Sequence, residues 1–237
     1  MKIGSKHTAL ATSFIGCELE LFENARHWKR YWSEKLRKYI SGATLEVGAG
    51  IGSNSEYLLT DSVAHLTLLE PEVKMFAMLN SKSYSNRITC VKGRIGDLAQ
   101  TFDTVVYIDV LEHIEDDYAE TASAYDRLGV GGMLVVLAPA WPFLFSPFDK
   151  AVGHHRRYTK GSLRKAIDPR FETVSEFYLD SIGLFASLAN RLFLRAAAPS
   201  HRQIEAWDRL MVPVSRVIDR LLFYSVGKTV VGVYRKR

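Results

Sequence analysis

TLEVGAGIGSN, residues 44–54, is the stretch that decides the fold of this chain. An apolar, β-rich run leads into three glycines at every second position, Gly48, Gly50 and Gly52, and a helix-compatible segment follows. Glycine allows backbone angles that a Cβ atom forbids, and it lets a ligand approach the main chain closely. The N–H groups at a helix start favour an electron-rich ligand. The stretch therefore predicts a buried strand, a tight turn and a helix N-terminus beside a ligand.

A second apolar run, Leu66–Glu70, ends in an acidic residue. Glu70 follows the glycines by about 20 residues, the spacing at which an acid binds a ribose diol. The glycine pattern is not that of a dinucleotide site, because Gly52 comes one residue too early. The residues by themselves therefore indicate a nucleoside-type ligand.

Three features in combination resemble the class I S-adenosylmethionine-dependent methyltransferases of the small-molecule type. They are Glu46 with its glycines, the acid Glu70, and the later run Asp109-Val110-Leu111-Glu112-His113. The resemblance covers residues 25–180, and it implies S-adenosylmethionine as cofactor and S-adenosyl-L-homocysteine as product.

The composition is that of a soluble globular protein, with 47% hydrophobic and 24% charged residues. The net charge of +5 favours an anionic acceptor or a membrane surface but is too small to indicate nucleic acid. The N-terminus lacks a signal-peptide core, and no apolar run reaches transmembrane length. Cys17 and Cys90 lack metal spacing, and a disulfide between them is not expected. We expect a cytoplasmic protein, with contact at a membrane surface as an addition.

Strand and helix patterns alternate along the chain, which predicts crossover units and a parallel sheet. We expect a Rossmann-like, doubly wound, mostly parallel seven-stranded α/β sheet with flanking helices and a helical insertion before the last strand. The predicted strands are 43–49, 65–70, 88–91, 102–109, 133–138, 171–180 and 228–234. The predicted helices are 18–40, 53–60, 71–79, 118–128, 162–167, 182–197 and 203–224, with a turn at 129–132.

One methyltransferase domain, 1–237, accounts for the whole pattern. We expect residues 1–40 to form a helical cover, 41–180 the cofactor-binding core, 181–226 a lid or acceptor insertion, and 227–237 the last strand. In the resembled family the last two strands are joined tightly, so the intervening residues form an addition.

The cofactor contacts are predicted at the carboxyl ends of the strands, where ligands bind in such sheets. The resemblance implies contacts to the methionine and ribose parts from the glycine loop and three acids. The adenine contact stays open, because Arg94 stands where an acid is usual, leaving the backbone near Ile95 or the side chain of Asp97. The full predicted set is Glu46, Gly48, Ala49, Gly50, Gly52, Glu70, Pro71, Arg94, Ile95, Asp109, Val110 and Leu111.

The acceptor side is predicted from the segment DKAVGHHRRYT, residues 149–159. Histidine titrates in the range useful for a general base, so His113, His154 and His155 are candidates, with no choice between the last two. A helix-capping histidine and arginines paired with Asp149 are the structural alternative. Further acceptor contacts are predicted from Trp28, Tyr31, Trp141, Arg156, Arg157 and Tyr158. No set of residues has metal-ligand spacing, and we expect no metal.

The favoured function is methylation of a small molecule, on an oxygen of a sugar, an acid, a phenol or a lipid-linked intermediate. An RNA methyltransferase and a non-catalytic S-adenosylmethionine-binding or membrane-peripheral protein are the alternatives.

Two apolar stripes in the insertion, Leu184–Phe193 and Trp207–Leu222, indicate a cover over the acceptor. A basic rim at Arg191, Arg195, Arg202, Arg209, Arg216 and Arg220 suits anionic headgroups. The acceptor's identity and the oligomeric state stay open.

Overall fold

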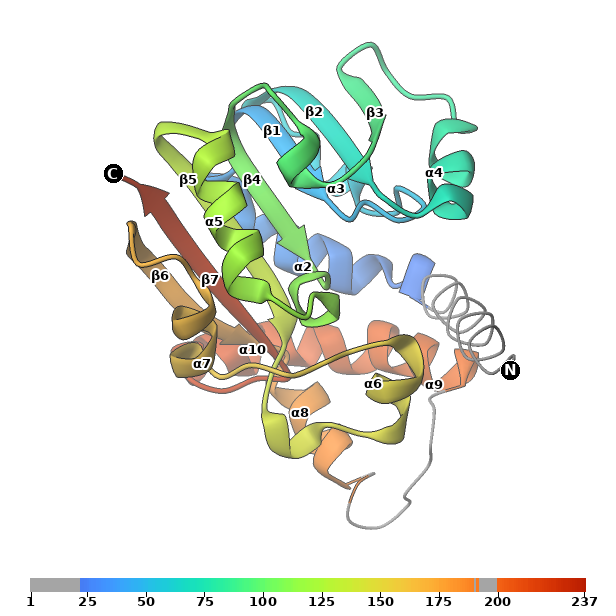
Figure 1. Ribbon diagram of the computed structural model, residues 1–237. Helices are drawn as coiled ribbons and strands as arrows, with labels where there is room; N and C mark the ends of the chain where they lie inside the picture. The colour runs from blue at the N-terminus through green and yellow to red at the C-terminus, as the bar shows by residue number, and fades with distance from the viewer. Residues whose placement is uncertain (1–21, 190, 192–199) are drawn as a thin grey trace, which may run out of the picture.

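Seven strands form one sheet in the part of the chain that the computed structural model describes, residues 22–189, 191 and 200–237. Their order is β3-β2-β1-β4-β5-β7-β6, and the first five strands pair in parallel (Figure 1). β7 runs antiparallel between β5 and β6. The strands are β1 Gly42–Val47, β2 Val63–Glu70, β3 Ile88–Lys92, β4 Phe102–Ile108, β5 Leu128–Pro139, β6 Phe171–Leu179 and β7 Thr229–Lys236. The predicted sheet is confirmed.

Helices cover both faces of this sheet (Figure 1). The described α-helices are α2 Arg26–Leu36, α3 Ser55–Leu58, α4 Val73–Asn80, α5 Asp117–Arg127, α6 Pro147–Val152, α7 Lys160–Ala166, α8 Ser181–Ala189, α9 His201–Ala206 and α10 Val212–Leu221. A π-helical turn, Trp207–Met211, joins α9 to α10. Thus α8, α9 and α10 form the predicted insertion between β6 and β7.

The strands are apolar on both sides because each face meets a separate layer of helices. Val106 of β4 packs in the core beneath α2 and α10, whereas its neighbour Val105 packs in the core beneath α5 and α7. Both side chains are fully buried. Near-continuous apolar strands are the expected sequence of such a doubly covered sheet.

Several predicted boundaries are wrong for local reasons. The turn at 129–132 lies inside β5, where a register shift pairs Phe102 with Leu128 and Thr104 with Met133. α4 starts after Pro71, because the side chain of Glu72 caps it by accepting the Met75 N–H at 2.8 Å. α6 was not predicted. It begins at a capping box between Ser146 and Asp149.

Some predicted features fall outside the described residues. They are Cys17 and the first part of helix 18–40, together with Leu192, Phe193 and Arg195 of the insertion. Across the described chain, no helix combines the length and the apolar character needed to span a bilayer.

Buried carboxylates attach the insertion to the rest of the molecule. Asp219 of α10 accepts the Tyr31 hydroxyl at 2.8 Å and the N–H groups of Asp180 and Ser181 at 2.7 and 2.9 Å. Asp208 likewise accepts the N–H of Trp28 at 2.8 Å. These bonds join α10 to α2 and to the start of α8, so the three helices hold one arrangement.

Replacing Asp219 by alanine should lower the free energy of unfolding by about 3 kcal/mol or more, because a buried hydroxyl and two buried N–H groups lose their acceptor. Urea denaturation followed by circular dichroism measures this loss. The matched control is Asp61→Ala at an exposed position, which should stay within about 0.5 kcal/mol of the unchanged protein. Equal effects of the two substitutions would contradict the anchoring role of Asp219.

Candidate active site

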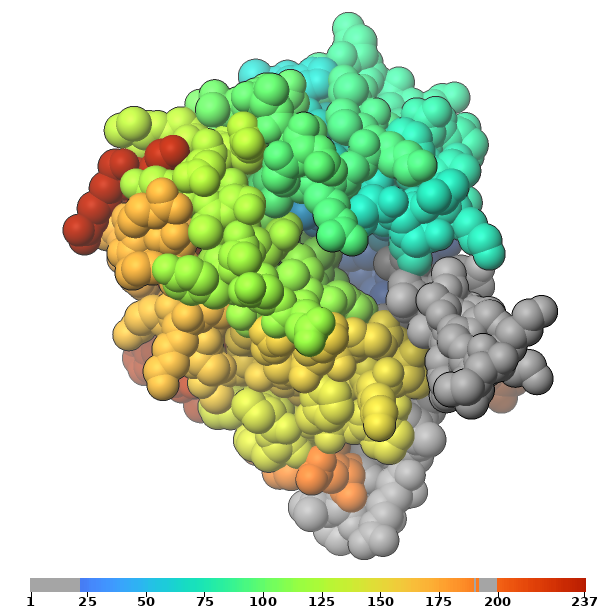
Figure 2. All heavy atoms as spheres, viewed as in Figure 1, coloured from blue at the N-terminus to red at the C-terminus, as the bar shows by residue number. Residues whose placement is uncertain are grey.

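A cavity of about 1310 Å³ opens at the carboxyl ends of the parallel strands. One end is bordered by the loop after β1 and the end of β2, and the other by α8, α9 and the π-helical turn. In Figure 2 the surface is hollowed between the cyan segment around α4 and the yellow segment that follows α6. The β1–β4 switch point lies at this edge, where such sheets bind ligands.

The glycine loop takes a backbone path that other residues rarely adopt. Gly48, Gly50 and Gly52 have φ of 67°, 56° and 75°. A Cβ on Gly48 would meet the side chain of Val110 at 2.8 Å, and one on Gly52 would overlap the hydroxyl of Tyr84. Gly48, Ala49 and Gly50 border the cavity, whereas Gly52 faces the protein. Gly52 therefore shapes the loop and lies away from the border of the cavity.

Glu70 closes this loop from the neighbouring strand. One carboxylate oxygen accepts the Gly50 N–H at 2.8 Å, and the other accepts the Glu72 N–H at 2.8 Å. Burial raises the pKa of Glu70, and these two bonds act against that rise. Each oxygen keeps a second lone pair, and the residue borders the cavity together with Pro71. The carboxylate thus holds the loop and can still accept bonds from a diol.

Glu46 lies beneath the loop and does not border the cavity, which corrects the expected direct contact. It accepts a hydrogen bond from the Asn54 amide at 3.1 Å, while its second oxygen has no hydrogen-bond partner among the described residues. Burial raises the pKa of Glu46 to about 7, against the bond from Asn54 and the charge of Lys29. Lys29 donates to the Ser53 carbonyl at 3.0 Å. Glu46 therefore acts on the cavity through Asn54, which does border it.

The end of β4 places a second acid in the cavity. Asp109 has φ of 53°, an uncommon value for a residue with a side chain, and it borders the cavity beside Val110. Asp109 is exposed to the cavity, and desolvation by the surrounding protein raises its pKa, against the charges of Lys228 and Arg157. Leu111 is fully buried and does not reach the cavity, because it packs in the core beneath α5 and α7.

Of the residues predicted around the adenine, only Arg94 reaches the cavity. Arg94 borders the cavity, but Ile95 is buried in the core and Asp97 caps its own turn by accepting the Arg94 N–H at 2.8 Å. Neither Ile95 nor Asp97 reaches the cavity.

The segment after α6 distinguishes the two adjacent histidines. His154 Nδ1 lies 2.9 Å from a carboxylate oxygen of the fully buried Asp149, whereas His155 is exposed at the cavity border. Arg157 holds the same carboxylate with two bonds of 2.8 and 3.0 Å. Burial would raise the pKa of Asp149, but the bonds from His154 and Arg157 keep it well below its usual range.

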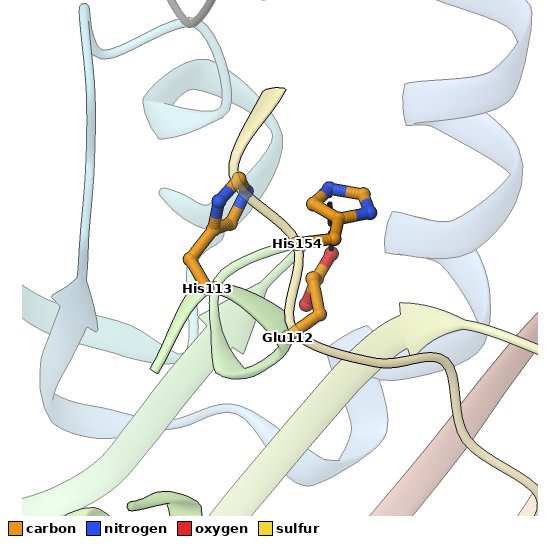
Figure 3. Close-up of side chains that lie close together, drawn as sticks. All are labelled: Glu112, His113 and His154. Carbon is orange, nitrogen blue, oxygen red and sulfur yellow. Dashed lines mark ion pairs between the residues drawn. The ribbon is translucent and has the colours of Figure 1, made fainter. Parts of the chain in front are cut away.

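Three side chains that can bind metal meet at the border of the cavity (Figure 3). Glu112, His113 and His154 each place a donor atom within 4.8 Å of the other two, and all three border the cavity. The His113 and His154 rings pack edge to face with centroids 4.5 Å apart. Burial and the neighbouring His154 lower the pKa of His113 to about 4. Sequence spacing did not predict this cluster, because about 40 residues separate His154 from the other two.

Four residues predicted at the acceptor lie away from the cavity. Each side chain is held elsewhere by a partner that sequence spacing did not reveal, and none of them borders the cavity. The contacts are Tyr31 to Asp219 and Tyr158 to Asp117 at 2.8 Å, Arg156 to Asp117 at 2.6 Å, and Trp141 to the Gly227 carbonyl at 2.7 Å. Trp28 and Arg157 do border the cavity.

Sequence reasoning also missed residues that the fold brings to the cavity. Lys228, directly before β7, places its Nζ 5.5 Å from the centroid of the Trp207 ring. Burial lowers the pKa of Lys228, against the charge of Asp180. Asp180 itself accepts the Trp207 indole N–H at 2.8 Å. The one available signal was the position of Lys228 directly after Gly227, before an apolar strand.

Comparison with solved structures shows the same fold in several methyltransferases. A chain in the complex of the Haloferax volcanii Trm112 methyltransferase activator with a methyltransferase is 14% identical, with 99% of each chain covered and a TM-score of 0.64. An S-adenosylmethionine-dependent methyltransferase from Mesorhizobium loti is 15% identical, with 85% of this chain and 96% of that chain covered and a TM-score of 0.58. The N-methyltransferase NodS from Bradyrhizobium japonicum, in complex with S-adenosyl-L-homocysteine, is 16% identical, with 91% and 87% covered and a TM-score of 0.54.

Sequence comparison gives a second, independent line of evidence. No curated protein matches this chain. The family profile described as a methyltransferase domain matches residues 45–134, from β1 into β5. This match, together with the shared fold, supports an S-adenosylmethionine-dependent methyltransferase, an enzyme that takes its methyl group from S-adenosylmethionine.

Proposed function

We propose that this methyltransferase acts on an oxygen atom of a small-molecule acceptor that binds beneath α8 and α9. The observation that carries the proposal is the continuity of the cavity from Glu70 through the histidine cluster to Trp207. Bound S-adenosylmethionine supplies a methyl group on a sulfonium, which an acceptor nucleophile takes in a displacement that leaves S-adenosyl-L-homocysteine. Such a displacement depends on holding the reacting atoms in line within an enclosed site.

The residues at the β1–β3 end suit S-adenosylmethionine by their chemistry. Glu70 offers carboxylate lone pairs to a ribose diol, and Asp109 offers a negative group to an ammonium or sulfonium. Gly48 and Gly50 bring the backbone to the cavity border without side chains. Pro71 and Met75 provide apolar surface beside Arg94, where a flat adenine can pack.

The other end of the cavity suits a small acceptor with an apolar body. Leu144, Phe145, Ile204, Trp207 and Met211 border it. Asp180 and Lys228 add opposite charges. The histidine cluster lies between the two ends, where an imidazole can serve an acceptor whose proton must leave. A hydroxyl is such an acceptor, so we assign its activation to His113 and His154 and not to His155.

The insertion also carries an apolar surface that faces outward. Four side chains repeat at helical spacing and are exposed by 49–69%: Leu210, Val214, Val217 and Leu221. Phe223, at the end of α10, is 88% exposed and has φ of 50°. Exposed cations lie on the same helical layer: Arg209 in the π-helical turn, Arg220 on α10, Arg30 on the adjacent α2, and Arg37 and Lys38 in the turn that follows α2. An apolar helix face with flanking cations suits an anionic membrane surface, from which a lipid-like acceptor could be taken.

Glu70→Ala should weaken S-adenosylmethionine binding about tenfold or more, because hydrogen bonds to a charged acceptor contribute about 1.5–3 kcal/mol. Isothermal titration calorimetry measures the dissociation constant, with thermal melting as the check on folding. Glu56→Ala, an exposed acid on α3, is the matched control and should bind normally. An unchanged constant in a folded Glu70→Ala protein would remove the ribose role from this residue.

His154→Ala should reduce turnover by roughly 10²–10⁴ and leave S-adenosylmethionine affinity unchanged, because this ring serves the acceptor. His155→Ala is the control and should turn over normally. The assay uses methyl-labelled cofactor with separate small-molecule, lipid and RNA fractions, followed by identification of the methylated atom. Label in RNA, or on nitrogen or carbon, would contradict the proposed acceptor, and normal turnover of His154→Ala would contradict the role of His154.

Changing Val217 and Leu221 together to aspartate should abolish binding to vesicles that contain anionic lipid, because both apolar anchors become charged. Co-sedimentation with phosphatidylglycerol vesicles measures binding, and neutral phosphatidylcholine vesicles should bind less. Val130→Asp, at an exposed position on β5, is the control. No sedimentation of the unchanged protein even at low salt would exclude the membrane surface, and a protein partner captured by the stripe would reassign it.

A further inference from the structure

The cluster of Glu112, His113 and His154 has the geometry of a ligand set. Glu112 and His113 come from the turn after β4, and His154 comes from the segment after α6. The Nε2 atom of His154 lies 3.9 Å from Oε1 of Glu112, as the dashed line in Figure 3 marks. One donor atom from each residue lies within 4.8 Å of the other two. Donors that share a cation at about 2.0–2.2 Å must lie within roughly 4.4 Å of one another, so small side-chain movements complete the set.

Each of the two histidine rings also has a hydrogen-bond partner outside the cluster. His154 binds Asp149 through Nδ1 at 2.9 Å, and His113 forms a hydrogen bond with the backbone of Gly153. Metal-binding histidines characteristically use their second ring nitrogen in this way, because the outer partner sets the tautomer and the ring orientation. Arg157 in turn holds the Asp149 carboxylate with two bonds. The rings are therefore oriented before any ligand arrives.

We propose that Glu112, His113 and His154 bind a divalent transition-metal cation, for which Zn²⁺ is the representative. Two imidazoles and one carboxylate form the type of ligand set that catalytic zinc sites use, with a further position left for water or substrate. All three side chains border the cavity, so that position faces the acceptor. The proposal rests on the proposed function and specifies how the cluster activates the acceptor oxygen.

The chemical role follows from the charge of the cation. A hydroxyl at the open position would have a lowered pKa, as water does on zinc. Its O–H bond would break, and the proton would pass to water. The oxygen could then form the new carbon–oxygen bond as the carbon–sulfur bond of the sulfonium breaks. His154 would act as a ligand in this arrangement, and Asp149 as a positioning residue behind it.

Metal binding by the full chain, stripped with a chelator and free of cofactor and acceptor, tests the proposal directly. Calorimetric titration with ZnCl₂ should show one site, and CoCl₂ should give the visible absorption of a low-coordinate site. Glu112→Gln and His154→Ala should each weaken Zn²⁺ binding at least tenfold. Asp149→Asn should weaken it about 10- to 100-fold by releasing the ring. His155→Ala, at the exposed neighbour, should bind Zn²⁺ normally.

Zn²⁺ affinity that is absent, or unchanged in Glu112→Gln and His154→Ala, would overturn the metal site. If Glu112→Gln fails to fold, Asp149→Asn and His154→Ala decide the question. Failure of the proposed function is distinguishable, because the titration contains neither cofactor nor acceptor. Oxygen methylation by chelator-treated enzyme at full rate would contradict the metal and leave His154, oriented by Asp149, as the base.

Discussion

The buried carboxylate of Asp149 is the contact on which the acceptor side of the active site depends. It begins α6 through Ser146, holds Arg157 with two bonds and orients the ring of His154. A carboxylate without exposure is stable only with such partners, since removing one leaves a charge unpaired. The same bonds that stabilise the charge therefore fix the path of residues 146–157 across the carboxyl ends of the strands.

Buried acids also join segments that are distant in sequence elsewhere in the molecule. Glu70 attaches the glycine loop to β2, while Asp219 and Asp208 attach the insertion to α2. Each acid accepts backbone N–H groups from a segment distant in sequence, so it joins elements that hydrophobic packing alone would leave free to slide. The cavity is consequently bordered by segments whose positions relative to the sheet are set by charge-assisted hydrogen bonds.

The features that the sequence predicted are those encoded locally. Gly48, Gly50, Glu70 and Asp109 border the cavity, as residues that directly follow apolar strands should, because strand ends meet at one edge of the sheet. The features that it missed depend on partners far along the chain. Tyr158 and Arg156 were expected at the acceptor but bind Asp117, about 40 residues away. The choice of His154 over His155 likewise needed the position of Asp149 in space, since the two rings are adjacent in sequence.

A crystal structure of the full chain with bound S-adenosyl-L-homocysteine would test the central claim most directly. The account predicts the ribose hydroxyls on the Glu70 carboxylate and the sulfur atom on the side of Asp109 that faces His113 and His154. The open part of the cavity would then lie between that sulfur atom and Trp207. S-adenosyl-L-homocysteine seated beneath α8 and α9, where the acceptor is expected, or a sulfur atom directed away from the histidines, would contradict the account.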